Sequence, residues 1–102
     1  MSTDEPPESG LELVPERLAV RVGGREVALT RTQFRLLSML HAEPGRTFSR
    51  AELVETGIGD LVSERTVDVH VKELRRKLGS DGWRIETVRG SGYRYRGQPP
   101  AG

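Results

Sequence analysis

The sequence predicts an α+β domain with an N-terminal antiparallel sheet, three helices and a C-terminal β-hairpin. Apolar and polar residues alternate between residues 11 and 29, which is typical of strands with one buried face. Three helix-start signals follow, and the segment 84–96 then has the pattern of two short strands around a glycine-rich tip. With 102 residues, the chain is long enough for one such domain with a modest core.

The three predicted strands occupy residues 11–14, 17–22 and 25–29. Gly23 and Gly24 separate the second from the third, and a glycine pair in that position indicates a tight hairpin turn. No side chain in this sheet suggests chemistry. We therefore expect it to have a packing role.

Each predicted helix follows a hydroxyl side chain that can cap it, with a possible capping partner three residues later. These pairs are Thr30 with Gln33, Ser49 with Glu52, and Ser63 with Thr66. The first two are complete capping boxes, whereas the third lacks the acid or amide. The first helix is expected over residues 31–42, before a Pro-Gly pair, and the second over about 50–56.

The third predicted helix is about 15 residues long and has two distinct sides. One side is an apolar stripe at helical spacing, formed by Val67, Val71, Leu74 and Leu78. The opposite side is mostly cationic and consists of Arg65, Val69, Lys72, Glu73 and Arg76. Only the turn 57–62 separates this helix from the one before it. The pair thus resembles a helix-turn-helix, whose second helix enters the major groove of DNA.

Charge is unevenly distributed along the chain, although the net charge is only +1. Residues 1–16 contain five acidic and no basic residues, while residues 63–96 contain nine basic and five acidic residues. Residues 1–10 are expected to be a disordered acidic tail, residues 11–96 the domain, and residues 97–102 a second disordered tail. A solvated tail is the simpler interpretation of the acidic segment; a mimic of phosphate is the alternative.

Two long motifs resemble the signature of the OmpR/PhoB-type winged-helix domain, the DNA-binding effector domain of bacterial response regulators. They are RTVDVHVKELRRKL and TVRGSGYRY, and the upstream run LTRTQFRLLSMLHAEPGRTFSRAELV resembles the first half of the same domain. The resemblance covers residues 11–96 and implies a winged helix-turn-helix fold with the C-terminal hairpin as the wing. It also implies a transcriptional regulator that binds double-stranded DNA on tandem direct repeats, with self-association on the DNA.

In that family the turn 57–62 contacts RNA polymerase. Here the turn is about two residues shorter than usual and has Ile58 where an aromatic residue is common, a departure that weighs against polymerase contact. Nothing in the chain resembles the receiver domain that normally precedes this module. The expectation is therefore either an excised effector domain or a standalone regulator.

The candidate DNA-binding residues come from the third helix and the wing. Long cations that can reach phosphates or guanine edges are Arg65, Lys72, Arg75 and Arg76. Val69 could contact a thymine methyl, and Thr66 and His70 could bond phosphates. Glu73 has two open interpretations: it accepts a hydrogen bond from cytosine N4, or it pairs with Lys77 four residues on.

The wing adds residues whose roles are implied by the resemblance. In the family, the positions of Thr87, Arg89 and Tyr93 contact DNA. An arginine beside two glycines at a hairpin tip can also enter a narrow minor groove. The simpler alternative is that the tip is only a turn and that Tyr93 and Tyr95 are core residues.

Enzymatic and metal-binding functions find no support in the sequence. His41 and His70 have no metal-ligand spacing, and the chain has no cysteine. The glycines of the tip lie between two strands and open no helix, so they form no phosphate loop. The sequence therefore predicts no catalytic residue, metal or cofactor.

The chain has no long apolar run and no signal pattern, and we expect a cytoplasmic protein that does not bind membranes. The rival hypothesis is a winged-helix protein-interaction module with little DNA affinity. The low net charge, Glu73 and the short turn favour it.

Overall fold

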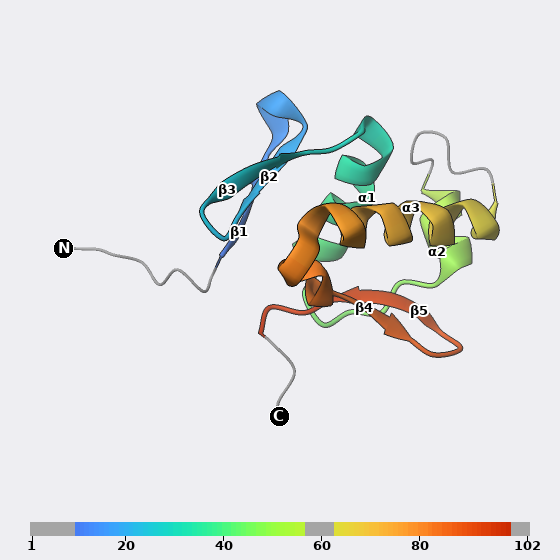
Figure 1. Ribbon diagram of the computed structural model, residues 1–102. Helices are drawn as coiled ribbons and strands as arrows, with labels where there is room; N and C mark the ends of the chain where they lie inside the picture. The colour runs from blue at the N-terminus through green and yellow to red at the C-terminus, as the bar shows by residue number, and fades with distance from the viewer. Residues whose placement is uncertain (1–9, 57–62, 99–102) are drawn as a thin grey trace.

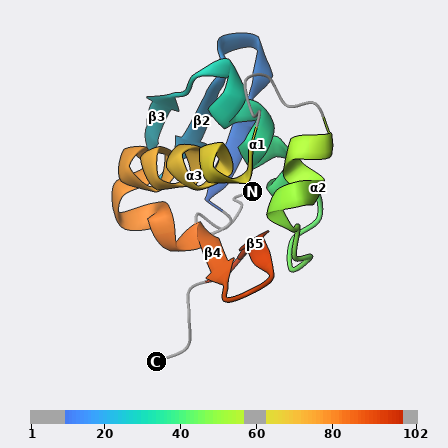
Figure 2. The same cartoon turned by 90° about the vertical axis from the view of Figure 1, so that its right-hand side faces the viewer.

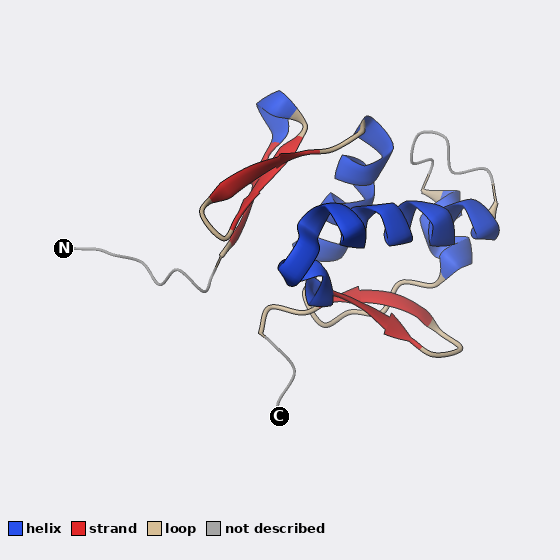
Figure 3. Ribbon diagram, in the orientation of Figure 1, coloured by secondary structure: helices blue, strands red, loops and turns tan. Residues whose placement is uncertain are grey.

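The computed structural model describes residues 10–56 and 63–98. Its elements are β1 (Leu11–Val14), η2 (Pro15–Arg17), β2 (Ala19–Val22), β3 (Arg25–Ala28), α1 (Arg31–Ala42), α2 (Arg50–Glu55), α3 (Glu64–Leu78), η3 (Gly79–Arg84), β4 (Ile85–Val88) and β5 (Gly92–Tyr95). Figure 1 and Figure 3 show the first three strands on one side of the helices and the β4–β5 hairpin on the other. The predicted α+β class is confirmed. The predicted tails, apart from residues 10, 97 and 98, and the turn 57–62 lie outside the described residues.

The N-terminal sheet is antiparallel in the order β1-β2-β3. Gly23 and Gly24 form the β2–β3 turn with φ angles of +57° and +79°, the left-handed conformation that a two-residue hairpin needs. The second strand was predicted from residue 17 and begins two residues later. Residues 15–17 instead form the 3-10 turn η2, which is closed by a 3.2 Å hydrogen bond from the Leu18 N–H to the Pro15 carbonyl.

All three predicted helix caps are present. The Thr30 hydroxyl accepts a hydrogen bond from the Gln33 N–H at 3.1 Å, and the Gln33 side chain accepts one from the Thr30 N–H at 3.1 Å. The second capping box closes in the same way, and at α3 the Ser63 hydroxyl accepts from the Thr66 N–H at 3.3 Å. Helix α1 has the predicted bounds, and α2 ends one residue before the predicted position.

One hydrophobic core joins the sheet, the helices and the hairpin. Helix α1 lies at its centre, with Leu36, Leu37 and Leu40 fully buried. The predicted apolar stripe of α3 is also buried, since none of its four residues is more than 1% exposed. The strands complete this core with Leu11, Val20, Val22, Ile85, Tyr93 and Tyr95. The apolar stripe of α3 therefore faces the core, and the opposite side of the helix faces outward.

The segment after α3 forms the 3-10 helix η3. Arg84, at its end, is only 5% exposed. Its Nε donates to Asp81 at 3.1 Å, and its Nη1 donates to the Tyr95 hydroxyl at 3.4 Å. A buried guanidinium needs such partners, and the tight turn supplies an acid three residues earlier.

Candidate nucleic-acid interface

The outward side of α3 carries a group of polar side chains around one apolar residue. We call Arg65, Val69, Lys72, Glu73 and Arg76 the outer face. Val69 is 56% exposed, although valine is usually a core residue. Arg65, Lys72 and Arg76 are exposed around it, and Glu73 is half-buried. The outer face can therefore present both charge and a small apolar surface to a partner.

Contacts on both flanks fix the orientation of the outer face. On one flank, Arg75 donates from Nε to the Ile85 carbonyl at 2.9 Å and from Nη2 to the Thr87 hydroxyl at 2.7 Å. On the other flank, Lys77 donates to the side-chain oxygen of Gln33 in α1 at 2.8 Å. Rotation of α3 about its axis would break one set of these bonds. The helix is thus locked between α1 and the hairpin.

The wing, residues 85–95, lies beside α3 and extends toward the side where α3 begins (Figure 1, Figure 2). Its strands pair from Ile85 with Tyr95 to Val88 with Gly92. The tip is closed by a 2.8 Å hydrogen bond from the Ser91 N–H to the Val88 carbonyl, and Gly90 has a φ of +78°. Arg89 is exposed at this tip, two residues from the Thr87 hydroxyl that Arg75 holds. The wing tip is therefore anchored to the same helix that bears the outer face.

A second set of contacts ties the wing to both helices of the helix-turn-helix. Asp68 in α3 accepts hydrogen bonds from Arg50 Nε at 2.6 Å and from the Tyr93 hydroxyl at 2.5 Å. Burial raises the pKa of the Asp68 carboxyl, but the hydrogen bonds from Tyr93 and Arg50 outweigh this effect and bring the pKa below its usual value. Asp68 is thus ionised at neutral pH and joins α2, α3 and β5.

Tyr93 is a packing residue in this arrangement. It is 5% exposed, its hydroxyl is bonded to Asp68, and the guanidiniums of Arg50 and Arg75 lie 5.1 and 5.7 Å from its ring centroid. This geometry agrees with the alternative of a core residue for the Tyr93 side chain, and the contact of Tyr93 with DNA stays a prediction. Tyr95 is also buried, as the sequence suggested. Its ring packs edge-on against that of His41, with the two ring centroids 4.9 Å apart.

The remaining predicted site residues differ in how free their side chains are. Thr87 is exposed but bonded to Arg75, and His70 and Thr66 are half-buried. The Thr66 hydroxyl also lies 3.0 Å from that of Ser63. The structure thus links α3 to the wing. Arg75 forms this link, because its side chain is hydrogen-bonded to Ile85 and Thr87 of the wing.

The predicted pairing of Glu73 with Lys77 is wrong. Glu73 accepts hydrogen bonds from Arg76, three residues on, at 2.7 and 3.1 Å, while Lys77 is held by Gln33. The tertiary contact draws Lys77 away, and Arg76 takes its place. The hydrogen bonds and charge of Arg76 lower the pKa of the Glu73 carboxyl.

Sequence reasoning missed Arg50 and Asp68. An acidic residue on a helix with more basic than acidic side chains was a visible signal at position 68. Its partners could not be named, because they lie 18 and 25 residues away in the chain. Only the packing of α2 and β5 against α3 brings them together.

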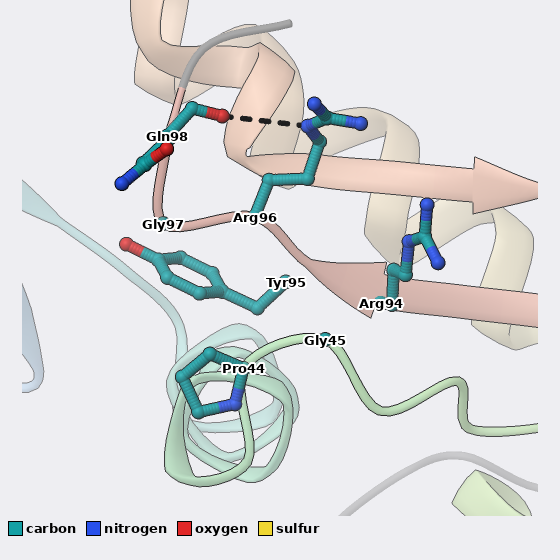
Figure 4. Close-up of a pocket in the computed structure, with 7 residues that line it drawn as sticks. All are labelled: Pro44, Gly45, Arg94, Tyr95, Arg96, Gly97 and Gln98. Carbon is teal, nitrogen blue, oxygen red and sulfur yellow. Dashed lines mark hydrogen bonds between the residues drawn. The ribbon is translucent and has the colours of Figure 1, made fainter.

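The described residues show no centre for metal chemistry. Residues 10–56 and 63–98 contain no group of three or more His, Cys, Asp or Glu side chains that could hold a metal ion. A pocket at the end of β5 is lined by Pro44, Gly45, Arg94, Tyr95, Arg96, Gly97 and Gln98 (Figure 4). Arg94 and Arg96 both donate to Glu86, at 2.7 and 3.1 Å, so these cations are already paired. Within the same ranges, every helix is too short or too polar to span a bilayer.

The fold and the outer face define a winged-helix domain of the response-regulator type. Residues 24–95 match the family described as transcriptional regulatory protein, C terminal, and the chain belongs to this family. Among solved structures, the DNA-binding domain of the response regulator AdeR, in complex with an intercistronic region, has a TM-score of 0.74 at 32% identity. That match covers 85% of this chain and 94% of the other. The DNA-binding domain of Klebsiella pneumoniae RstA, in complex with the RstA box, has a TM-score of 0.71 at 33% identity, with coverages of 87% and 93%.

Curated relatives are regulators of greater length. The phosphate regulon transcriptional regulatory protein PhoB of Rhizobium meliloti is 47% identical over 87 residues, which is 81% of this chain and 38% of that protein. The transcriptional regulatory protein CseB of Streptomyces avermitilis is 46% identical over 90 residues, with coverages of 84% and 37%. The chain thus spans less than half the length of these relatives.

Proposed function

We propose that this chain binds double-stranded DNA in a sequence-specific manner and thereby regulates transcription. The observation that carries the proposal is the rigid connection between the outer face and the wing tip. The Arg75 bonds to Ile85 and Thr87 hold both on one body, so one duplex can meet α3 in its major groove and Arg89 in the next minor groove. Structural relatives with this fold are described in complexes with DNA.

Each side chain has a distinct role in this proposal. Arg65, Lys72 and Arg76 contact phosphates or guanine edges, and Val69 packs on a thymine methyl. The half-buried Thr66 and His70 and the exposed Thr87 add phosphate contacts at the border of the interface. Arg75, Asp68 and Tyr93 position the wing. The proposal assigns no catalytic role to any of these residues.

We further propose, from the resemblance to this family, how the chain is arranged on DNA and what else it contacts. Binding to tandem direct repeats, with self-association on DNA, fits a single module whose own interface is small. Contact with RNA polymerase through the turn 57–62 is a further proposal, against which the short turn and Ile58 weigh. The turn lies outside the described residues. Bacterial DNA lies in the cytoplasm, so the proposed DNA binding implies that location for the protein.

A salt titration of duplex binding tests the proposal. Genuine phosphate contacts release counterions, so log affinity should fall linearly with log salt concentration. Arg89→Ala and Lys72→Ala should each reduce that slope by about one unit. Arg17→Ala is the matched control, because Arg17 is an exposed cation that is ion-paired with Glu26. Its element, η2, lies at an end of the N-terminal sheet that points away from the wing (Figure 1).

The rival proposal is a protein-interaction module with little DNA affinity. The observation that favours it is the Glu73–Arg76 pair, which neutralises part of the outer face. If duplex binding is no tighter at roughly 50 mM than at 200 mM salt, the interaction module becomes the better explanation.

A further inference from the structure

A preformed pair of opposite charges lies on the outer face of α3. Arg76 donates to Oε1 of Glu73 from both Nε and Nη2, at 3.1 and 2.7 Å. The side chains of Glu73 and Arg76 are 44% and 68% exposed. Among the hydrogen bonds of the described residues, none involves Oε2 of Glu73 or Nη1 of Arg76. The pair therefore presents a hydrogen-bond acceptor and a donor side by side to whatever meets α3.

The major-groove edge of a C·G base pair carries the complementary groups in the same order. Cytosine offers its N4 amino donor, and the paired guanine offers the O6 and N7 acceptors. An ionised carboxylate accepts hydrogen bonds only, so guanine and thymine edges repel it. Adenine carries its N7 acceptor beside its N6 amino donor. A carboxylate that accepts from N6 would therefore place its second oxygen against the N7 acceptor, which is unfavourable. Cytosine is thus the base that suits Glu73.

The pairing with Arg76 also makes the carboxylate tolerable on this face. A carboxylate that meets DNA alone would be repelled by the phosphates. The adjacent guanidinium cancels that charge locally without covering the free oxygen. Val69 lies one turn earlier on the same side, with its Cβ about 5–6 Å from that of Glu73 by helix geometry. This spacing is about one to two base-pair steps, so a thymine methyl can meet Val69 beside the C·G pair.

We propose that Glu73 and Arg76 read a C·G base pair as a unit, with Glu73 accepting from cytosine N4 and Arg76 donating to guanine O6 or N7. The proposal rests on the proposed function, because it requires α3 to lie in the major groove. It deepens that function by naming a base pair and the residues that specify it. The predicted recognition sequence also contains a thymine within two base-pair steps of the cytosine, and Val69 contacts the methyl group of this thymine.

Selection from a random duplex library tests the proposal with the full chain and with Glu73→Gln. The unmodified chain should enrich one C·G pair, and Glu73→Gln should shift that position toward A·T, because glutamine bonds adenine N6 and N7 together. In direct competition, the unmodified chain should prefer its selected duplex over the version with A·T at that position by about 5- to 100-fold. Arg76→Ala should reduce this discrimination at the same position.

The control is Glu12→Gln, which changes an exposed carboxylate that is likewise paired with an arginine, Arg21, at 3.1 Å in the sheet. It should leave every base preference unchanged. If Glu73→Gln binds all duplexes more tightly by one factor and keeps the original base preferences, Glu73 acts only by repulsion and the proposal fails. If the unmodified chain enriches no duplex at all, the proposed function fails first, so the two failures are distinguishable.

Discussion

Single residues in this protein show how local surroundings set chemical behaviour. His41 lies in the last turn of α1. Its ring packs edge-on against the ring of Tyr95. Burial lowers the pKa of His41 below its ordinary value of 6.5, and the nearby Arg84 guanidinium lowers it further. The neutral imidazole is therefore the form that the folded state prefers.

This preference predicts a pH dependence of stability. The unfolded chain binds more protons at His41 than the folded chain does below about pH 6.5, so the free energy of unfolding falls as pH decreases through that range. A series of thermal melts from pH 7.5 to 5.5 should show a falling Tm for the unmodified chain and a flatter profile for His41→Gln. Equal slopes for the two proteins would contradict the assignment.

Gly92 illustrates a backbone constraint at the base of the wing tip. Its φ is +142°, and a Cβ added there would lie 1.9 Å from the Phe48 carbonyl oxygen. That carbonyl accepts a hydrogen bond from the Tyr93 N–H at 3.0 Å, so the wing and the segment before α2 approach each other closely. No side chain fits between them.

Gly92→Ala should therefore destabilise the fold by about 3 kcal/mol or more, measured by urea denaturation. The matched control is Gly90→Ala, at a tip position with a φ of +78° and open space around the missing Cβ. That change carries only the backbone strain, about 1 kcal/mol. A Gly90→Ala variant as unstable as Gly92→Ala would show that conformation, and not the Phe48 contact, sets the cost.

At the scale of elements, Asp68 is the joint between α2, α3 and the wing. Asp68→Asn should weaken its hydrogen bonds to Arg50 and Tyr93 and lower stability by about 1–3 kcal/mol. Tyr93→Phe removes the hydroxyl alone and should cost less. If the two residues act through one hydrogen bond, the double variant should lose less than the sum of the single losses, as measured by denaturation in a double-mutant cycle. Strict additivity would contradict the joint.

The same elements show what the sequence could and could not predict. Helix starts and the buried stripe of α3 were predictable, because caps and stripes depend on residues three or four positions apart. The partner of Lys77 was not, because Gln33 lies 44 residues away and competes with the local carboxylate of Glu73. The sequence likewise could not predict whether Tyr93 is buried, because it does not reveal which face of the hairpin packs against α3.

At the scale of the whole molecule, the N-terminal sheet is part of the same core as α3. Val20 and Val22 are fully buried in the cluster that includes α1, α3 and the wing. Arg25 in β3 also donates to the Leu78 carbonyl at the end of α3, at 2.8 Å. The packing role expected for the sheet is thus confirmed, and the sheet supports the orientation of α3.

A shared core predicts a single cooperative unfolding transition. Val20→Ala, in β2, removes two buried carbons and should lower the free energy of unfolding by about 2–3 kcal/mol. Trp83, the only tryptophan, lies in η3 next to the wing and reports on that distant region by fluorescence. If the sheet, the helices and the wing unfold together, Val20→Ala should shift the urea midpoint measured by fluorescence as much as the midpoint measured by far-UV circular dichroism. A shift seen by circular dichroism alone would mean that the sheet unfolds independently, and α3 would then keep its orientation without it.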